Sequence, residues 1–400
     1  MSRAESQTYL LDPSFGKSVD LPVDQAQGLP NEAYTSHAFF EYERDNLFAK
    51  TWSCVGVACD LPDPGDAKPI SFMGLPLFML RDRSGGIRVF HNVCSHRGLE
   101  IIGAPCKIKS NMLRCPYHSW VYDFEGELRR TPMIGGPGAD NCDGFSKAGK
   151  GLSQVRSAVW LDMIFINLSG DAPAFEDHMA PLMERWSHYD FSLLRHGGAD
   201  SAWRIEMDAN WKLPVENHCD AYHLPWVHPE LNRISRFEDH YPLLNEDLFA
   251  GQGSRAYNGE IPEGAPSLPF FPGLDEVQRK TAEYVSIYPN ATVGVHGNHI
   301  WTVWFEVVAP DRTVERMEIY YVGEEPLGDD HKSTREKVHA DWLQVWREDL
   351  WVVESMQRGR SSPAFQGGVF SPVLDQPVHN LHRWVTRQLA GDRGSRVAAE

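Results

Sequence analysis

Short apolar and alternating runs dominate the chain between residues 52 and 168. The runs WSCVGVA, PISFMG, LPLFMLR and IRVFHNV are separated by Asp-Pro, Pro-Gly and Gly-Gly pairs, and WLDMIFINL closes the segment. Runs of this length that are bounded by turn residues are typical of β-strands. The pattern therefore predicts an all-β module of about one hundred residues, the size of a sandwich or a small barrel.

The second half of the chain mixes the two periodicities. A helical pattern in FEDHMAPLMERW is followed by a strand-like run, AWRIEMDA, and later by three strand candidates: EYVSIYP, ATVGVHGNHIWTVWFEVVAP with a turn at Gly297-Asn298, and VERMEIYYVG. Simple hairpins would join them into an antiparallel sheet. A long helix is predicted over 333–357, where apolar residues recur at helical spacing.

Two further segments complete the predicted organisation. Residues 1–30 have no clear period and are interpreted as an extended arm, and residues 31–50 are predicted to be a helix in which Glu43 is solvated. Residues 230–280 are rich in Gly, Pro, Asn and aromatic residues and are interpreted as a long loop region. Its GQGSRA sequence resembles half of a dinucleotide fingerprint, but it follows no clear strand, so a flexible loop is favoured. The predicted fold class is α+β.

The charge and composition of the chain exclude several classes of binding partner and of location. The formal net charge of −17 argues against nucleic acid and against an anionic membrane surface. No apolar run approaches the roughly 18 residues that span a bilayer, and the N-terminus has no secretion-signal pattern, so the cytoplasm is the expected location. Seven cysteines, an odd number, do not indicate a disulfide framework.

Four metal-ligating residues lie in the predicted β module. Cys94 and His96 form C-x-H, and after eighteen residues Cys115 and His118 form C-x-x-H. Each pair follows a predicted strand and precedes a turn, so two loops at one tip would bring the four side chains together. Two thiolates and two imidazoles suit either a tetrahedral zinc ion or a [2Fe-2S] cluster with two histidine ligands.

A second set of candidate ligands lies in NWKLPVENHCDAYHLPWVH, residues 210–228. Asn217, Asp220 and His223 are spaced by three and would share one face of a helix. Pro225 is expected to end or bend that helix, which would let His228 approach His223. Two histidines and one carboxylate, with open coordination positions, describe an oxygen-activating non-haem Fe(II) centre. The alternative is that these histidines are ordinary polar residues near a helix end.

A carboxylate for this centre is found on the predicted helix 333–357. Asp349 lies on its apolar stripe, where an unpaired carboxylate would be costly to bury. A metal ion would remove that cost, and so would a lysine or arginine partner. Glu348 and Glu354 lie off the stripe and are expected to be solvated.

Both metal motifs, in this order, resemble those of the large subunit of Rieske non-haem iron oxygenases. The resemblance rests on C-x-H…C-x-x-H, on N-W-K-x-P-x-E-N…D-x-Y-H…H and on REDLWVVESMQ, and runs from about Trp52 to Gln357. It implies a small all-β Rieske [2Fe-2S] domain at 51–169 and a larger, helix-grip-like catalytic domain with mononuclear iron at 170–400. The arm and helix at 1–50 are expected to pack with the catalytic domain.

The resemblance also implies roles for single residues. Asp220 would bridge to a cluster histidine of a neighbouring subunit and carry the electron, and Asn217 would shape the surroundings of the iron. A homotrimer is the implied assembly. One cluster iron would be bound by Cys94 and Cys115, the other by His96 and His118, and the Fe(II) by His223, His228 and Asp349.

The reaction implied is that of a terminal oxygenase. Electrons from NAD(P)H would arrive through a separate flavin and iron–sulfur reductase, with or without a ferredoxin, because the chain has no convincing nucleotide or flavin site. With O2 as co-substrate it would hydroxylate or oxidatively N-demethylate a small organic molecule. A catalytically inactive electron carrier and a zinc-stabilised structural protein are the competing hypotheses.

The layout is closest to the group of monooxygenases that act on choline, betaines and related quaternary amines. Aromatic rings of the catalytic half could cage a quaternary ammonium group by cation–π attraction, although core packing also explains such rings. The alternative substrate is an arene or an aromatic acid, attacked by a dioxygenase. The candidate rings are Trp203, Tyr284, Trp301, Trp304, Tyr320 and Tyr321.

Overall fold

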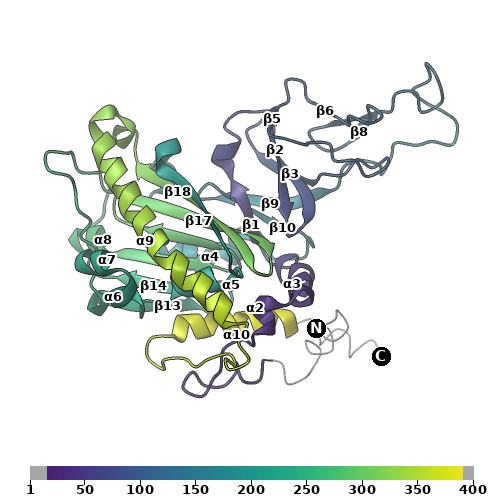
Figure 1. Cartoon of the computed structure of the whole chain (residues 1–400). Coiled ribbons are helices and arrows are strands. Elements are labelled where there is room, and N and C mark those ends of the chain that lie inside the picture. The colour runs from purple at the N-terminus through teal and green to yellow at the C-terminus, as the bar shows by residue number, and fades with distance from the viewer. Residues whose placement is uncertain (1–15, 391–400) are drawn as a thin grey trace. The chain divides into compact units, whose positions relative to one another are not determined.

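The computed structural model describes residues 16–390 and divides the chain into two compact units (Figure 1). The β unit is Cys54–Ala172, and the mixed unit combines Met1–Ser53 with Pro173–Glu400. In sequence, the β unit is thus inserted between the two parts of the mixed unit.

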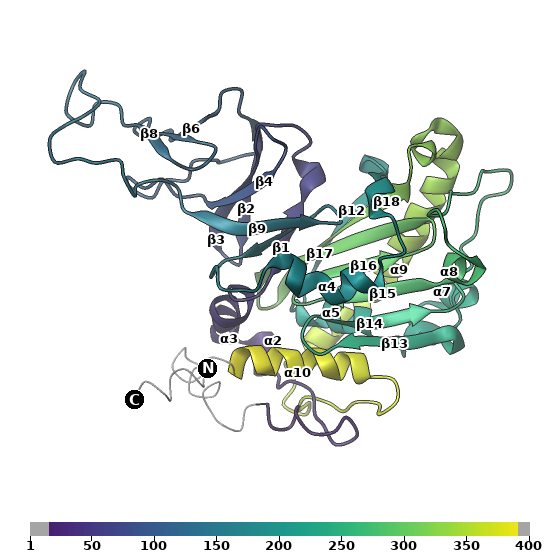
Figure 2. The ribbon, with the colours of Figure 1, turned by 180° about the vertical axis from the view of Figure 1, so that it is seen from behind.

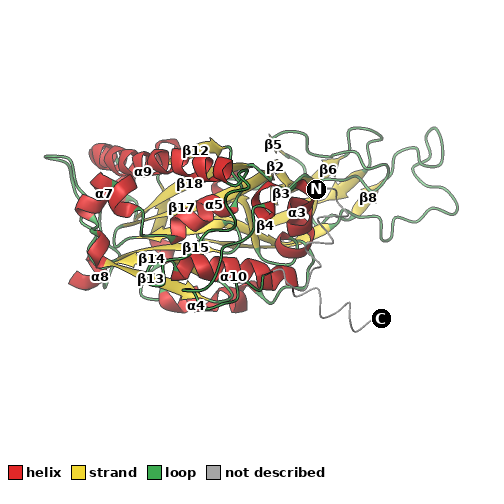
Figure 3. Ribbon diagram, turned by 60° about the horizontal axis from the view of Figure 1, so that its bottom comes forward, coloured by secondary structure: helices red, strands yellow, loops and turns green. Residues whose placement is uncertain are grey.

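The β unit consists of one larger and one smaller antiparallel sheet, which appear among long loops in Figure 3. Its hydrophobic core includes Cys94 and Cys115, so the predicted ligand loops pack into the core of the unit. The larger sheet has the order β1-β10-β9-β4-β3-β2-β5 and the smaller β6-β7-β8. The strands are β1 (Ser53–Val57), β2 (Asp66–Phe72), β3 (Leu75–Arg81), β4 (Ile87–His91), β5 (Cys106–Lys107), β6 (Met112–Arg114), β7 (Val121–Asp123), β8 (Leu128–Arg130), β9 (Gln154–Trp160) and β10 (Met163–Asn167).

The predicted run WLDMIFINL contains the end of one strand and the whole of the next. Strand β9 ends at Trp160 and β10 begins at Met163, with Leu161 and Asp162 between them in left-handed conformations (φ 49° and 64°). A two-residue turn of this kind usually carries Asn or Gly, and neither is present here. The sequence therefore offered no signal for this turn, and the two strands were predicted as one.

The mixed unit is built on an antiparallel sheet with the order β11-β18-β17-β16-β15-β14-β13, in which β12 also pairs with β18. The predicted turn at Gly297-Asn298 joins β16 to β17, and the predicted α+β class is confirmed. The strands are β11 (Leu194–His196), β12 (Ala202–Met207), β13 (His240–Asn245), β14 (Phe249–Ser254), β15 (Ala282–Ile287), β16 (Ala291–Val295), β17 (His299–Ala309) and β18 (Arg312–Val322).

The interpretation of residues 230–280 as a long loop was wrong in part. Strands β13 and β14 form a hairpin there that extends the sheet, and GQGSRA begins inside β14. A Cβ atom at Gly251 would lie 2.0 Å from the carbonyl oxygen of Tyr284, and one at Gly253 would lie 2.3 Å from the ring of Tyr241. These glycines therefore allow close packing of the strand, and the segment is not a flexible loop.

Helices cover both faces of this sheet. Along β15, Glu283 bonds to Trp186 next to α4 (Phe175–Arg185), whereas Tyr284 packs against Trp342 of α9 (Lys332–Gly359). Neighbouring strand residues point to opposite faces, so α4 and α9 lie on opposite sides, as Figures 1 and 2 show. Helix α9 agrees with the prediction, apart from its ends.

Two shorter helices pack against the sheet, and one of them also packs against α9. Helix α5 (Lys212–Cys219) contacts α9, β14 and β15, and α10 (Gln376–Ala390) contacts β13, β14 and α5. Helix α10 was not predicted, although it buries Leu381, Trp384 and Val385. No helix among residues 16–390 is long and apolar enough to cross a membrane.

The predicted helix at 31–50 is broken into α2 (Glu32–Thr35), α3 (His37–Glu43) and a π-helical turn, η1 (Arg44–Phe48). Ser36 interrupts it because its side chain caps α3, accepting a hydrogen bond from the backbone of Phe39. Residues 1–15 of the expected arm lie outside the described residues.

Glu43 is not solvated, as had been expected, but fully buried. Its Oε1 lies 2.7 Å from Nζ of Lys212, which is also buried, and Trp211 Nε1 donates to its Oε2. A buried ion pair is costly to break because the remaining charge has no partner. The pair therefore fixes the start of α5 against the N-terminal helices.

We expect Lys212→Met to destabilise the mixed unit by about 3–5 kcal/mol, because it leaves the Glu43 carboxylate buried without its cation. Calorimetric unfolding should show a lower midpoint for one transition. The double variant Lys212→Met, Glu43→Gln should recover part of the loss. A single variant as stable as the parent protein would show that the pair has no structural role.

Two candidate metal centres

The two cysteine loops of the β unit share one backbone design. In each, the N–H of the cysteine donates to the carbonyl five residues on, at 2.8 Å for both Cys94 and Cys115, and the N–H four residues on donates back to the cysteine carbonyl. The fourth residue has positive φ, 76° at Gly98 and 58° at Ser119. Gly98 adopts this conformation without strain, which explains its place in the motif.

The two loops bring all four predicted ligands together. The rings of His96 and His118 are 4.5 Å apart at 67°, and both cysteines are buried. The Nδ1 atoms of both histidines are buried and have no hydrogen-bond partner among the described residues. Buried nitrogens without a partner are costly, and metal ligation would remove that cost, so the four side chains fit an iron or zinc site.

Two polar residues that the sequence did not single out hold the first loop. Asn92 is buried, and its side chain accepts hydrogen bonds from the backbone of Ile101 and Ile102 and donates to the carbonyl of Ile102. The Tyr122 hydroxyl lies 3.2 Å from Sγ of Cys94 and accepts a hydrogen bond from the backbone of Ser95. Their polarity beside apolar strand residues is the only signal that the sequence offers.

In the mixed unit, the predicted continuous helix through Asn217, Asp220 and His223 is not formed. Helix α5 ends at Cys219, and Asp220 is extended (φ −96°, ψ 124°). Pro225 does not break a helix; it lies in the first turn of α6 (Leu224–Val227), where its missing N–H costs nothing. The backbone therefore turns at Asp220.

His228 lies between α6 and α7 (Pro229–Ile234), so both histidines face α9. Nε2 of His228 is 2.9 Å, and Nε2 of His223 is 3.7 Å, from Oδ1 of Asp349. The three ligand atoms lie within 4.8 Å of one another. Two ligands at about 2.1 Å from one ion and at right angles are separated by about 3 Å, so the spacing fits a shared ion.

Asp349 has histidine partners rather than the alternative lysine or arginine within the described part of the chain. Its Oδ1 is buried and lacks an aligned hydrogen-bond donor, although His228 is close. Burial alone would raise the pKa of Asp349, but His228, His223 and a hydrogen bond from Asn217 together hold it below the ordinary value. Asn217 is thus beside the candidate iron site, as expected.

A carboxylate stands behind each histidine. Asp220 Oδ2 is 3.0 Å from Nδ1 of His223, and Glu348 Oε2 is 2.8 Å from Nδ1 of His228. A neutral imidazole that donates from Nδ1 to a carboxylate keeps Nε2 free as a ligand. Burial alone would lower the pKa of His228, but Asp349 and Glu348 outweigh it and raise the pKa above its ordinary value.

Sequence reasoning missed Glu348, which was expected to be solvated. Its Oε1 accepts a hydrogen bond from Gln344, so both carboxylate oxygens are engaged. The helical stripe placed Glu348 outside the core because that pattern describes the face toward the sheet, whereas His228 approaches α9 from the side. The adjacent acidic pair at 348 and 349 was the available signal.

Glu216, next to Asn217, anchors this end of α5. The Tyr34 hydroxyl donates to its Oε1 at 2.5 Å, and Nε2 of His382 lies 3.0 Å from the same oxygen. Because Nδ1 of His382 accepts from the backbone of Leu29, the ring donates from Nε2 in its neutral form. Helices α2, α5 and α10 are therefore joined just behind the candidate iron ligands.

A cavity of about 50 Å³ adjoins the three candidate ligands, and four aromatic rings line it. Tyr284 and Trp301 come from the sheet, and Trp342 and Trp346 come from α9. The ring of Trp346 is nearly perpendicular to those of Trp301 (88°) and Trp342 (77°). The other candidate rings, Trp203, Trp304, Tyr320 and Tyr321, are not among the residues that line this cavity.

Comparison with known families places a domain at each centre. The description "Rieske [2Fe-2S] domain" matches residues 51–137, and "Ring hydroxylating alpha subunit (catalytic domain)" matches residues 194–391. The first match decides between zinc and the [2Fe-2S] cluster, in favour of the cluster. The second corresponds to the catalytic domain of a non-haem iron oxygenase.

Relatives match over most of their length. The carnitine monooxygenase oxygenase subunit of Acinetobacter pittii is 29% identical over 86% of this chain and 88% of its own. The choline monooxygenase of Spinacia oleracea is 27% identical over 97% of this chain and 83% of its own. The glycine betaine monooxygenase oxygenase subunit of Chromohalobacter salexigens is 26% identical over 94% of this chain and 90% of its own.

Solved structures have the same fold. The quaternary ammonium Rieske monooxygenase CntA superimposes with a TM-score of 0.74 at 23% identity, covering 94% of this chain and 98% of that one. A naphthalene 1,2-dioxygenase superimposes with a TM-score of 0.69 at 16% identity, covering 93% of this chain and 95% of that one. The chain contains both a Rieske domain and a ring-hydroxylating catalytic domain, and its relatives are named as oxygenase subunits. The protein therefore belongs to the Rieske non-haem iron oxygenases, as an oxygenase (alpha) subunit that depends on a reductase for electrons.

Proposed function

We propose that this subunit hydroxylates or oxidatively N-demethylates a quaternary ammonium compound. One observation carries the proposal of a working oxygenase: Nε2 of His223 and of His228 converge on Asp349, while Asp220 and Glu348 hold the opposite ring nitrogens. An electron carrier with an inactive catalytic half would not need these second carboxylates. The named activities of the relatives support the substrate class.

In this proposal the ligands divide between two centres. Cys94 and Cys115 would bind one iron of the cluster, and His96 and His118 would bind the other. The mononuclear Fe(II) would be bound by His223, His228 and Asp349, and it would supply the site at which O2 is activated.

The residues around the mononuclear site orient the substrate and exclude water. Trp301, Trp342, Trp346 and Tyr284 surround the cavity with apolar surface and with ring faces that attract a quaternary ammonium group. Trp301 packs edge-to-face against Trp342 and Trp346 and is stacked on Tyr284, and these contacts keep the rings in place. Glu348 holds the His228 ring in position, and Asn217 lines the cavity together with Asp349.

Electron delivery is proposed to pass between subunits of a cytoplasmic homotrimer, through Asp220. Close to Asp220, Tyr222 and Trp226 are 50% and 80% exposed. On the β unit, Tyr117 and Leu99 of the cluster loops are 57% and 40% exposed. Exposed apolar side chains at both places suit a head-to-tail contact between copies. An NAD(P)H-dependent flavin and iron–sulfur reductase, with or without a ferredoxin, is the proposed donor.

Asp349→Ala should lose the mononuclear iron and keep the cluster, since one of three ligands is removed. The iron content should fall from about three to about two atoms per chain, whereas the two labile sulfides and the cluster spectrum should be unchanged. Glu336→Ala, on the exposed face of the same helix, is the control. A full iron complement in Asp349→Ala would count against this ligand.

Asp220→Ala should stop turnover while the cluster remains reducible, because the proposed route between subunits passes through this carboxylate. Cluster reduction by the reductase and product formation are measured on the same sample. Asp247→Ala, at an exposed side chain, serves as the control. Product formation at the parent rate would refute the bridging role.

Glu348→Ala should weaken iron binding about 10–100-fold, because His228 loses the carboxylate that orients its ring. Competition with a chelator measures the affinity, and the cluster spectrum reports integrity of the remainder. Glu348→Gln should recover part of the affinity by restoring a hydrogen-bond acceptor. If both variants hold iron as tightly as the parent, Glu348 does not position His228.

A further inference from the structure

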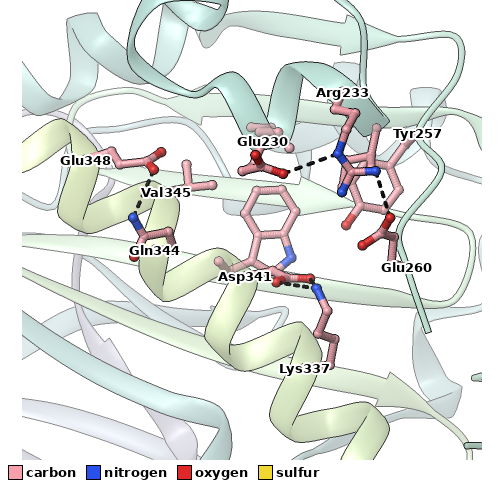
Figure 4. A pocket seen from close by; sticks show the side chains of 12 residues that line it. Glu230, Arg233, Tyr257, Glu260, Lys337, Asp341, Gln344, Val345 and Glu348 are labelled. Atoms are coloured by element: carbon pink, nitrogen blue, oxygen red, sulfur yellow. Dashed lines mark hydrogen bonds and ion pairs between the residues drawn. The ribbon is translucent and has the colours of Figure 1, made fainter. Parts of the chain in front are cut away.

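A second cavity, of about 190 Å³, neighbours the one beside the iron ligands (Figure 4). The two cavities share Leu231, Trp342 and Val345 as wall residues. Because the two cavities adjoin at these residues, the second cavity offers space for the other end of a substrate whose first end lies among the aromatic rings. The charges of this cavity therefore bear on the chemistry of that other end.

Carboxylates outnumber cations in the second cavity. The acidic wall residues are Glu230, Glu260, Asp341 and Glu348, and the basic ones are Arg233 and Lys337. Figure 4 shows these side chains around the cavity, with the ion pairs as dashed lines. Like charges brought together without compensation are repulsive, so an anionic group would be disfavoured here.

Both cations already have carboxylate partners. Arg233 donates to Glu260 at 2.8 Å and to Glu230 at 3.2 Å, and Lys337 lies 2.5 Å from Asp341. The side chain of Arg233 is 55% exposed, so these pairs are weak individually. A substrate carboxylate would nevertheless have to compete with two glutamates for one guanidinium group.

Among the described residues, the smaller cavity beside the iron ligands offers no other cation for a substrate carboxylate. Its lining contains no lysine or arginine from the part of the chain that the structure describes. Its polar side chains are Asn217, Gln252, Tyr284 and histidines, besides the ligand Asp349. Among residues 16–390, neither cavity therefore has an uncommitted cation that could bind a carboxylate.

On the basis of the proposed function, we infer that the substrate is a quaternary ammonium compound whose other end carries no carboxylate. A hydroxyl or a second amine at that end could bind in the acidic cavity, since both groups can donate hydrogen bonds to its carboxylates. The relatives named for choline and for carnitine or betaine differ in this feature, so it is a question of specificity within the group.

Binding of choline and glycine betaine to the full-length holoprotein tests the inference directly. Both carry a trimethylammonium group, and they differ in a terminal hydroxyl against a carboxylate. Anaerobic titration calorimetry of the iron-loaded protein should give a dissociation constant for betaine at least about tenfold above that for choline, a difference of about 1.4 kcal/mol.

The double variant Glu230→Gln, Glu260→Gln tests the physical cause. It leaves Arg233 without its two carboxylate partners, so the ratio of the betaine to the choline dissociation constant should fall at least about tenfold. The double variant Glu246→Gln, Glu263→Gln is the control: it removes the same two negative charges at exposed residues outside both linings, and should leave the ratio unchanged.

The outcomes separate the inference from the proposed function. Betaine binding as tight as that of choline, or a ratio that the double variant does not change, overturns the inference while the proposed function stands. If neither amine binds and an aromatic acid does, the proposed function is wrong and the inference falls with it. Tighter choline binding together with a changed ratio supports both.

Discussion

The catalytic half depends on hydrogen bonds that fix which nitrogen of each histidine is free. Asp220 and Glu348 accept from Nδ1 of His223 and His228, and this leaves both Nε2 atoms directed at Asp349. Without these bonds, either ring could rotate and present the other nitrogen. The three proposed ligands come from two segments far apart in sequence, and Glu348 also joins α9 to the α5–α7 region through His228.

This arrangement requires helix α5 to be held firmly. The buried pair of Lys212 and Glu43 fixes its first turn, and Glu216 fixes its last turn through Tyr34 and His382. The N-terminal helices and α10 therefore act on the iron site indirectly, as supports for the segment that carries Asn217. Such buried polar networks specify one geometry because any other would leave a charge without its partner.

The ligand motifs selected side chains that lie close together, whereas periodicity missed some elements of the fold. The ligand types at fixed offsets indicated both centres, and the structure brings the predicted side chains together. The break at Asp220 and the burial of Glu43 could not be read from the sequence, because both follow from partners distant along the chain. The same holds for β14, where Gly251 and Gly253 appear flexible until Tyr284 and Tyr241 are placed against them.

The paired cysteine loops have a consequence for maturation of the protein. Each loop closes through its own backbone hydrogen bonds, and Asn92 and Tyr122 secure the first one from the interior. Since these contacts involve no bound group, the binding loops can take their shape as the β unit folds. Assembly of the iron–sulfur group would then add iron and sulfide to loops whose backbone is already closed by hydrogen bonds of the chain itself.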